Sequence, residues 1–288
     1  MSEESKTKSA ASLADLLKDV AARLEAVSDS PRLDAEVLLG LAIDVPRSYF
    51  FSHPEDTPDP GAIERLEKNL QRRINGEPMA YITGSKEFWS LELMVTPATL
   101  VPRPETEVLV DLALREIPRD AEWNILDLGT GSGAIACAIG KERPRCDITA
   151  VDRSADALRV AEQNVRSLDL ANVECLEGDW TAPVTGRIFD LIVSNPPYVE
   201  EGHPDLERLR REPQMAIVSG DDGFDAVRVL ARDCPALLRD GSALIIEHGF
   251  EQESGIASIL NEHGWSALEC HKDLAGLPRV TMARIRAD

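Results

Sequence analysis

Apolar residues recur at helical spacing in three stretches within the first 76 residues. In the first stretch, which Ser12 can cap, they are Leu13, Leu16, Leu17, Val20, Leu24 and Val27. In the second, which starts with Ser30 and Pro31, they are Leu33, Val37, Leu38 and Leu41. In the third, which stops at Gly76, they are Ile63, Leu66, Leu70 and Ile74. Such stripes are typical of amphipathic helices, so we predict a small all-helical domain over residues 1–78.

The pattern changes at residue 79. Residues 79–104, MAYITGSKEFWSLELMVTPATLVPRP, are rich in aromatic and β-branched residues and contain a Gly-Ser break. This composition favours strands joined by a turn. We therefore predict a β-hairpin that links the helical domain to the rest of the chain.

From residue 122, short apolar strands alternate with amphipathic helices. The predicted strands are 123–129, 147–152, 173–179, 189–198, 241–249, 265–273 and 278–286. The predicted helices between them are 133–143, 154–168, 222–238 and 251–264. This alternation predicts an α/β domain over residues 105–288, with a doubly wound, mostly parallel, Rossmann-like sheet of seven strands closed by a hairpin. Ligands of such sheets bind at the carboxyl ends of the strands.

Composition and charge narrow the class of protein. The 288 residues carry a formal net charge of −20, with 51 acidic residues against 31 Lys and Arg, so a basic nucleic-acid-binding face is not expected. The chain shows neither an apolar run long enough to span a bilayer nor an N-terminal signal core, and we expect a cytoplasmic protein. The five cysteines are scattered and the five histidines lack ligand spacing, so we expect no disulfide framework and no metal. A monomer is expected because no heptad run is present.

A glycine-rich loop follows the first predicted strand of the α/β domain. In LDLGTGSG, residues Gly129, Thr130, Gly131, Ser132 and Gly133 open the next helix. Glycines there permit a tight turn and a close approach of backbone to ligand, and the helix start favours an anionic group. The loop by itself leaves three readings open: a nicotinamide dinucleotide, another nucleotide-like cofactor, or a turn with no ligand.

Acidic residues end the next two strands. Asp152 lies 19 residues after Gly133, where a carboxylate can accept hydrogen bonds from both hydroxyls of a ribose. Asp179 and Trp180 end the third strand and offer a polar group and a stacking face to a purine base. These residues indicate that the ligand contains a nucleoside, but they do not indicate which cofactor it is. Their alternative roles are a helix cap for Asp152 and a core position for Trp180.

The fourth strand ends in Asn-Pro-Pro-Tyr, whose two prolines cannot donate to a sheet. The same residues are suited to hold an amide NH₂ group, an arrangement that we call the clamp. The side-chain oxygen of Asn195 and the backbone oxygen of Pro196 can accept hydrogen bonds from one NH₂ group. Pro196 and Pro197 stiffen the backbone, and Tyr198 offers a flat face to a planar amide or base. Because the lone pair of such a nitrogen is delocalised, holding it in line is the main catalytic device, and we assign catalysis to these four residues.

LDLGTGSG together with NPPY resembles the class I methyltransferases that use S-adenosyl-L-methionine to modify planar nitrogens. Two substrates share this motif, a protein glutamine and adenine N6 of DNA or RNA. The flanks resemble the HemK/PrmC family, on RRINGEPMAYITGSKEFWSLELMVTPATLVPRPETE, NPPYVEEG, REPQMAIVSGDDGFDAVRVL, IEHGFEQ and DLAGLPRV. The resemblance runs from about residue 10 to the C-terminus. It leaves adenine-N6 methylation as the runner-up, followed by a non-catalytic cofactor-binding or partner-binding module.

The resemblance implies N5-methylation of the glutamine in the Gly-Gly-Gln motif of peptide chain release factors. By motif position, the cofactor residues are Gly129, Thr130, Gly131, Ser132, Gly133, Asp152, Asp179, Trp180 and Asn195. Phe88, Arg103 and Glu105 are expected to close over the cofactor, although PRPETE also reads as a helix start. Glu247, at the end of the fifth strand, is expected to be structural. The helical module is expected to help hold the release factor.

Overall fold

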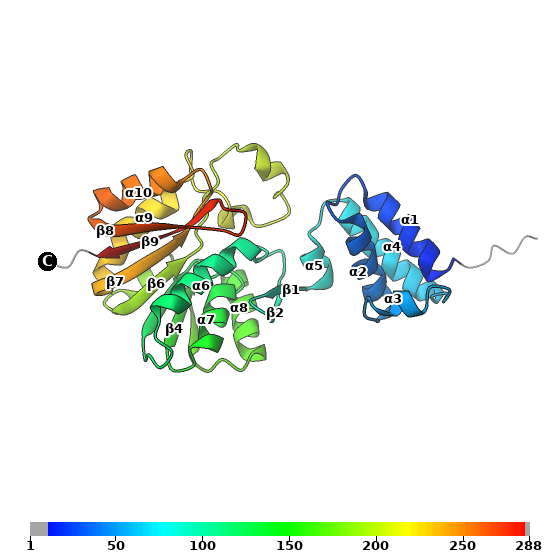
Figure 1. The fold of residues 1–288 in the computed structure, drawn as a ribbon, viewed down its shortest axis with the longest axis horizontal. Helices are drawn as coiled ribbons and strands as arrows, with labels where there is room; N and C mark the ends of the chain where they lie inside the picture. The colour runs from blue at the N-terminus through cyan, green and yellow to red at the C-terminus, as the bar shows by residue number, and fades with distance from the viewer. Residues whose placement is uncertain (1–10, 286–288) are drawn as a thin grey trace, which may run out of the picture. The chain divides into compact units, whose positions relative to one another are not determined.

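The computed structural model describes residues 11–285, and the chain divides into two compact units between Thr83 and Gly84. The first unit is all-helical and the second is α/β (Figure 1). The helices of the first unit are α1 (Leu13–Leu24), α2 (Pro31–Ile43), α3 (Tyr49–Ser52), α4 (Pro60–Ile74) and α5 (Met79–Thr83). Within residues 11–285, no helix is both long enough and apolar enough to cross a membrane.

The helical unit packs α1, α2 and α4 around one apolar core. Ser12 caps α1 by accepting from the Asp15 amide, and Asp59 caps α4 by accepting from the Ala62 amide. Because Asp59 caps and Pro60 fits the first turn, α4 begins at Pro60, three residues before Ile63, the first apolar residue of the predicted stripe. The prediction is wrong for Val27, which lies beyond the end of α1 and is 38% exposed. It is also wrong for Leu33 and Leu41, which are 40% and 43% exposed, because the apolar residues that α2 buries are Ala35, Leu38, Leu39 and Ala42.

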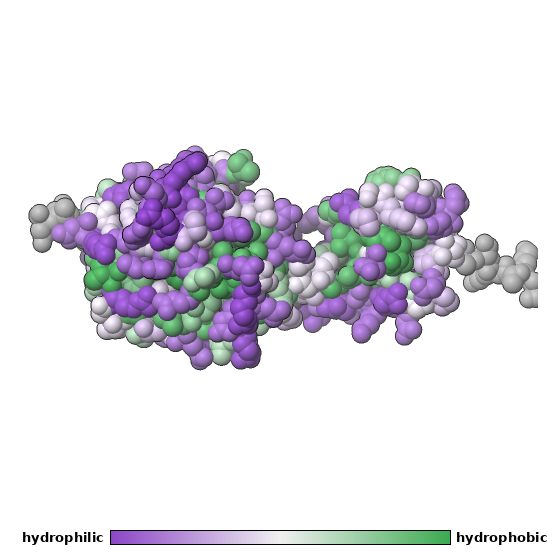
Figure 2. All heavy atoms as spheres, turned by 90° about the horizontal axis from the view of Figure 1, so that it is seen from below, coloured by the Kyte–Doolittle hydropathy of each residue, from purple (hydrophilic) through white to green (hydrophobic). Residues whose placement is uncertain are grey.

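Apolar side chains remain on the surface of this unit. The exposed large ones are Val27, Leu33, Leu41 and Phe51. Figure 2 shows a patch of hydrophobic residues on the visible face of the helical unit, bordered by hydrophilic ones. Scattered exposed apolar residues are normal on protein surfaces, and contiguous patches are less common.

Residues 79–104, predicted as a single linker, are divided between the units. Helix α5 belongs to the first, where Ile82 is part of the apolar core. The hairpin of β1 (Ser85–Phe88) and β2 (Leu91–Met94) belongs to the second. Trp89 and Ser90 form its two-residue turn with positive φ at both positions, 52° and 57°, as a type I′ hairpin requires. The side chain of Asn164 holds the hairpin on the α/β unit, by accepting from the Met94 amide and donating to the Met94 carbonyl.

The α/β unit contains the predicted sheet of seven strands, in the order β5-β4-β3-β6-β7-β9-β8. The strands are β3 (Asn124–Leu128), β4 (Asp147–Asp152), β5 (Val173–Glu177), β6 (Phe189–Ser194), β7 (Leu238–Glu247), β8 (Trp265–Lys272) and β9 (Pro278–Ile285). All neighbouring strands from β5 to β7 are parallel, and β9 runs antiparallel to both β7 and β8. The strand order reverses between β3 and β6, which is where open α/β sheets bind ligands.

Helices cover both faces of this sheet (Figure 1). The helices are α6 (Glu107–Glu116), α7 (Ala134–Glu142), α8 (Ala155–Ser167), α9 (Asp225–Asp233) and α10 (Glu253–Glu262). Alternate residues of β3 show the two cores: Ile125 packs with α6 and α7, and Leu126 packs with α9 and α10. The sheet is therefore buried on both sides, and its strand ends are the natural place for polar chemistry.

Candidate active site

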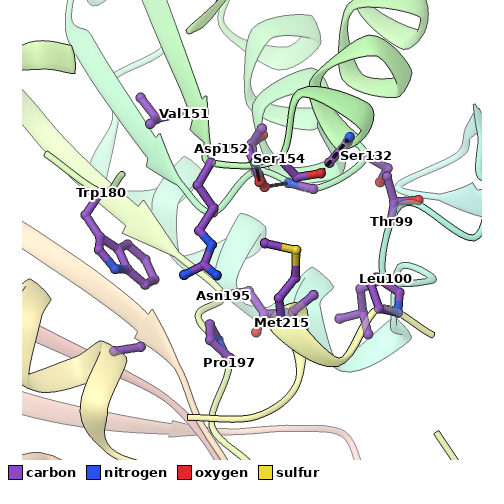
Figure 3. A pocket seen from close by; sticks show the side chains of 18 of the residues that line it. Thr99, Leu100, Ser132, Val151, Asp152, Ser154, Trp180, Asn195, Pro197 and Met215 are labelled. Carbon is purple, nitrogen blue, oxygen red and sulfur yellow. Dashed lines mark hydrogen bonds between the residues drawn. The ribbon is translucent and has the colours of Figure 1, made fainter. Parts of the chain in front are cut away.

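A cavity of about 340 Å³ opens at the carboxyl ends of β3, β4 and β6. Figure 3 shows Asp152 and Ser132 on one side of it and Asn195 and Pro197 on the other, with Met215 between them. The predicted site residues on its wall are Gly129, Thr130, Gly131, Ser132, Asp152, Asp179, Trp180, Asn195 and Pro197. The structure thus brings together four loops that are far apart in the sequence.

The glycine loop is tied to the end of the neighbouring strand. Asp152 accepts a hydrogen bond from the Gly131 amide at 2.9 Å through Oδ2, and another from the Ser154 amide at 2.9 Å through Oδ1. Gly131 has φ +57° and Gly133, the residue before α7, has φ +80°, so a β-branched side chain would be strained at either position. A carboxylate has about four acceptor positions, which leaves Asp152 capacity for the hydroxyls of a ribose.

The indole of Trp180 forms one wall of the cavity. Trp180 adopts a left-handed backbone conformation, with φ 47°, and is partly packed against the apolar core on the α9 and α10 face. A Cβ on Gly129 would stand 3.9 Å from the Trp180 ring, so the glycine loop and the indole are in close reach. An aromatic face, a carboxylate with remaining acceptor capacity at Asp152 and glycine backbone are what an adenosine with a charged tail needs, and these residues fit S-adenosyl-L-methionine.

Asn195 faces the cavity from the end of β6. Its Nδ2 donates a hydrogen bond to the Thr106 hydroxyl at 3.1 Å, and both residues line the cavity. Pro197 also lies on the wall, whereas Pro196 and Tyr198 do not. The backbone carbonyl of Tyr198 accepts from Gln252 Nε2 at 2.9 Å, and burial raises the pKa of its phenol to about 12. Gln252 therefore anchors the strand end that carries Asn195.

The rest of the wall comes from two loops that belong to the motifs of the family resemblance, although only Arg103 in them was expected at the site. Residues 98–103 precede the first turn of α6, and residues 213–220 follow β6 by a long connection. Glu212, only 6% exposed, joins them. Its Oε2 accepts from the Val101 amide at 3.0 Å and its Oε1 from Arg103 at 2.5 Å. No local signal identifies Glu212, because its partners lie more than 100 residues away in the chain.

Of the three residues expected to close over the cofactor, Phe88, Arg103 and Glu105, only Arg103 lines the cavity. Arg103 lies on the cavity wall, as expected. Phe88 does not: it is 1% exposed and packs in the core with Leu93 and Leu109, so the expectation is wrong for Phe88. Glu105 does not line the cavity, nor does Gly133, which is buried against Ala161 on α8. An aromatic residue in a hairpin can serve either the core or a site, and the pattern alone did not distinguish them.

Two carboxyl groups beside the site are almost fully buried. Asp127 accepts from the Thr130 hydroxyl at 2.6 Å, and its other oxygen has no hydrogen-bond partner within residues 11–285. Burial raises the pKa of Asp127 to about 7, and that of Glu247 to about 7 as well. Raised carboxyl pKa values next to a cavity are common at functional sites.

The sheet order and the cavity at its switch point define a class I methyltransferase fold. A solved structure of a methyltransferase from Pyrococcus furiosus has the same fold, with a TM-score of 0.53 and 18% sequence identity over 76% of this chain and 98% of that one. Two family models match the chain: "PrmC N-terminal domain" over residues 15–84 and "Methyltransferase small domain" over residues 106–212.

Relatives cover nearly the whole chain. A release factor glutamine methyltransferase of Coxiella burnetii is 40% identical over 273 residues, which are 95% of this chain and 99% of that protein. A release factor glutamine methyltransferase of Escherichia coli K12 is 41% identical over 271 residues, 93% of this chain and 97% of that protein. The chain belongs to the family of release factor glutamine methyltransferases.

Proposed function

We propose that this protein methylates the N5 amide nitrogen of the glutamine in the Gly-Gly-Gln motif of peptide chain release factors. The methyl donor is S-adenosyl-L-methionine, and the second product is S-adenosyl-L-homocysteine. The observation that carries the proposal is that Asn195 and Pro197 share one cavity with Asp152 and Trp180. A hydrogen-bond acceptor for an amide thus lies beside a site for an adenosine. Adenine-N6 methylation is not favoured, because the relatives over nearly the whole chain are glutamine methyltransferases.

The cofactor side of the cavity binds and orients the donor. Asp152 would accept from the ribose hydroxyls, Trp180 would cover the adenine, and the loop from Gly129 to Ser132 would hold the charged tail. When bound, S-adenosyl-L-methionine supplies a methyl group on a sulfonium, which carries the positive charge that the reaction removes.

The substrate side holds the nitrogen. Asn195 Oδ1 and the Pro196 carbonyl accept the two N–H groups of the glutamine amide, while Pro197 confines its plane from the cavity wall. The nitrogen–carbon bond forms as the carbon–sulfur bond breaks, and the nitrogen gives up one proton to water. Because the acceptors favour positive charge on the nitrogen and fix it in line, they accelerate the transfer without a metal.

The proposal also covers the helical unit and the setting of the reaction. The helical unit docks the release factor, and the support is its exposed apolar residues and its match to the PrmC N-terminal domain. The enzyme works as a monomer in the cytoplasm, where release factors act on the ribosome. Its substrate is protein and not nucleic acid, in keeping with the net charge of −20.

The test incubates the purified protein and S-adenosyl-L-methionine with an unmethylated release factor, and then analyses the Gly-Gly-Gln peptide by mass spectrometry. One added methyl group on that glutamine is expected, and none when the glutamine is replaced. If the peptide gains no methyl group while adenine in added DNA or RNA does, the proposal is wrong.

A further inference from the structure

Two buried residues, Thr106 and Glu247, lie next to the side-chain amide of Asn195. Thr106 ends the short helical turn Pro104–Thr106 before α6 and is 4% exposed. Glu247 is the last residue of β7 and is 1% exposed. Strands β6 and β7 pair Ser194 with Ile246, so the next residue of each strand, Asn195 and Glu247, lie side by side at the sheet edge.

Asn195 and Thr106 share a hydrogen bond of defined direction, and the Glu247 carboxyl is their neighbour. Asn195 Nδ2 donates to the Thr106 hydroxyl at 3.1 Å. That hydroxyl keeps its own proton, which it can donate to a carboxylate. Burial raises the pKa of the Glu247 carboxyl to about 7, and the neighbouring Thr106 and Asn195 side chains lower it by a smaller amount. Arg279 also lowers the pKa of Glu247, and Glu105 raises it.

This direction fixes which end of the Asn195 amide faces the substrate. An asparagine amide has two donors on nitrogen and one acceptor oxygen. Thr106 and Glu247 take up the nitrogen side, which leaves Oδ1 for the cavity. Glu247 itself does not line the cavity, so it can reach the substrate only through its neighbours.

Burying the Glu247 carboxyl at the end of β7 lowers the stability of the fold. One oxygen of Glu247 is buried with no hydrogen-bond partner within residues 11–285. A buried polar atom without a partner costs about 1–3 kcal/mol. An apolar residue at the end of β7 would avoid that cost, as its neighbours Ile245 and Ile246 do. A cost of this kind is expected where the group serves the site.

We propose that Thr106 and Glu247 are positioning residues that hold the Asn195 amide with its oxygen toward the cavity, so that the site selects an amide NH₂ over a carboxylate. The inference rests on the proposed function and adds the basis of its selectivity. The two groups that hold the amide, Asn195 Oδ1 and the Pro196 carbonyl, are both acceptors, so a carboxylate in the same place would face their lone pairs and find no donor on either. If the Asn195 amide turned over, its NH₂ would donate to a carboxylate, and the discrimination would fall.

The experiment compares the binding of two release factors, one with Gly-Gly-Gln and one with Gly-Gly-Glu, in the presence of S-adenosyl-L-homocysteine. Wild-type protein should bind the glutamine form more tightly. Thr106→Val keeps the shape and removes the hydroxyl, and should reduce the ratio of the two affinities about tenfold or more. Thr106→Ser should restore it. Glu247→Gln should also lower the ratio, and it carries the test if Thr106→Val does not fold.

A double variant tests whether Thr106 and Glu247 act on the affinity ratio through the same amide or independently. Because Thr106 and Glu247 act on one amide, Thr106→Val with Glu247→Gln should lower the ratio by less than the product of the two single effects. The matched control is Thr149→Val, since Thr149 donates to the carboxylate of Glu174 at 2.8 Å and is 1% exposed, but lies off the cavity. It should lower stability and leave the ratio unchanged. An unchanged ratio in Thr106→Val, or equal losses in the two valine variants, would overturn the proposal.

A second readout does not depend on the reaction. The side-chain NH₂ of Asn195, observed by NMR in selectively labelled protein, should exchange slowly with water, and quickly in Thr106→Val. If the wild-type protein fails to methylate the release factor but keeps this protected NH₂, the proposed function fails and the positioning of Asn195 stands. A rapidly exchanging NH₂ in the wild-type protein would reject the positioning role whatever the substrate.

Discussion

Glu212 accepts a hydrogen bond from Arg103 at 2.5 Å, although 109 residues separate them in the chain. The Glu212 side chain is 4% exposed and that of Arg103 33%, so one partner is buried and the other reaches solvent. Glu212 also accepts from the Val101 amide. A single carboxylate therefore holds the two loops that complete the cavity wall.

Glu212→Gln should weaken cofactor binding. The glutamine oxygen can still accept from the Val101 amide, but its NH₂ cannot accept from Arg103. Because Arg103 is partly exposed, the loss is modest, and we expect the Kd for S-adenosyl-L-methionine to rise about three- to tenfold by calorimetry. Glu207→Gln is the control, since Glu207 pairs with Arg210 on the exposed surface of the same connection. Equal Kd values for Glu212→Gln and Glu207→Gln would show that the contacts of Glu212 with Arg103 and Val101 do not shape the site.

Asp152→Asn should weaken cofactor binding more strongly. Asp152 accepts from the Gly131 and Ser154 amides, and an asparagine NH₂ would oppose one of these donors. The charge that favours the ribose hydroxyls is also lost. We expect the Kd for S-adenosyl-L-methionine to rise at least about tenfold. Asp156→Asn on the exposed face of α8, where Asp156 pairs with Arg159, is the control. An unchanged affinity in Asp152→Asn would count against its ribose role.

Asn195→Ala should separate binding from transfer. The alanine removes the acceptor that holds the substrate nitrogen, so the single-turnover rate should fall by several orders of magnitude while cofactor affinity changes little. Asn172→Ala provides a matched control, because the Asn172 side chain donates to the carbonyls of Gly140, Arg143 and Cys146 and lies off the cavity. That variant should lose stability and keep its rate. A nearly wild-type rate in Asn195→Ala would refute the clamp.

Asp127 should make the protein less stable as the pH rises. Burial raises the pKa of Asp127 to about 7, against about 3.9 in an unfolded chain. Between these values the unfolded state has released the proton that the folded state keeps. The free energy of unfolding therefore falls as pH increases from about 4 to about 7, and levels off above that.

Asp127→Asn should remove this dependence. Relative to wild type, its free energy of unfolding should rise by about 1–3 kcal/mol between about pH 5 and about pH 8, measured by urea denaturation at both. Asp120→Asn, at an exposed position before β3, should show the same difference from wild type at both pH values. A pH-independent difference for Asp127→Asn would mean that Asp127 is ionised in the folded state.

The strands of the α/β unit could be predicted closely because each is a short apolar run bounded by turn residues. The predicted strand 147–152 coincides with β4, and 265–273 differs from β8 by one residue. The prediction is wrong at the end of 189–198, because β6 stops at Ser194 before the prolines, and at the start of 241–249, because β7 begins at Leu238. The short helices α3 and α5 were not predicted, since four or five residues give too little periodicity. The burial of Phe88 could not be predicted, because hairpin residues alternate between core and solvent only once their partner is known.

The sequence by itself determined the class of fold, the loops that meet at the strand ends, and a clamp suited to an amide nitrogen. These follow from local rules, because periodicity, capping and turn chemistry act over a few residues. Only the tertiary structure decided that Glu212 joins two cavity loops, and that Thr106 and Glu247 stand behind Asn195. Those relationships depend on strand order and register, which bring distant segments within a few ångströms and leave no trace in the spacing of residues along the chain.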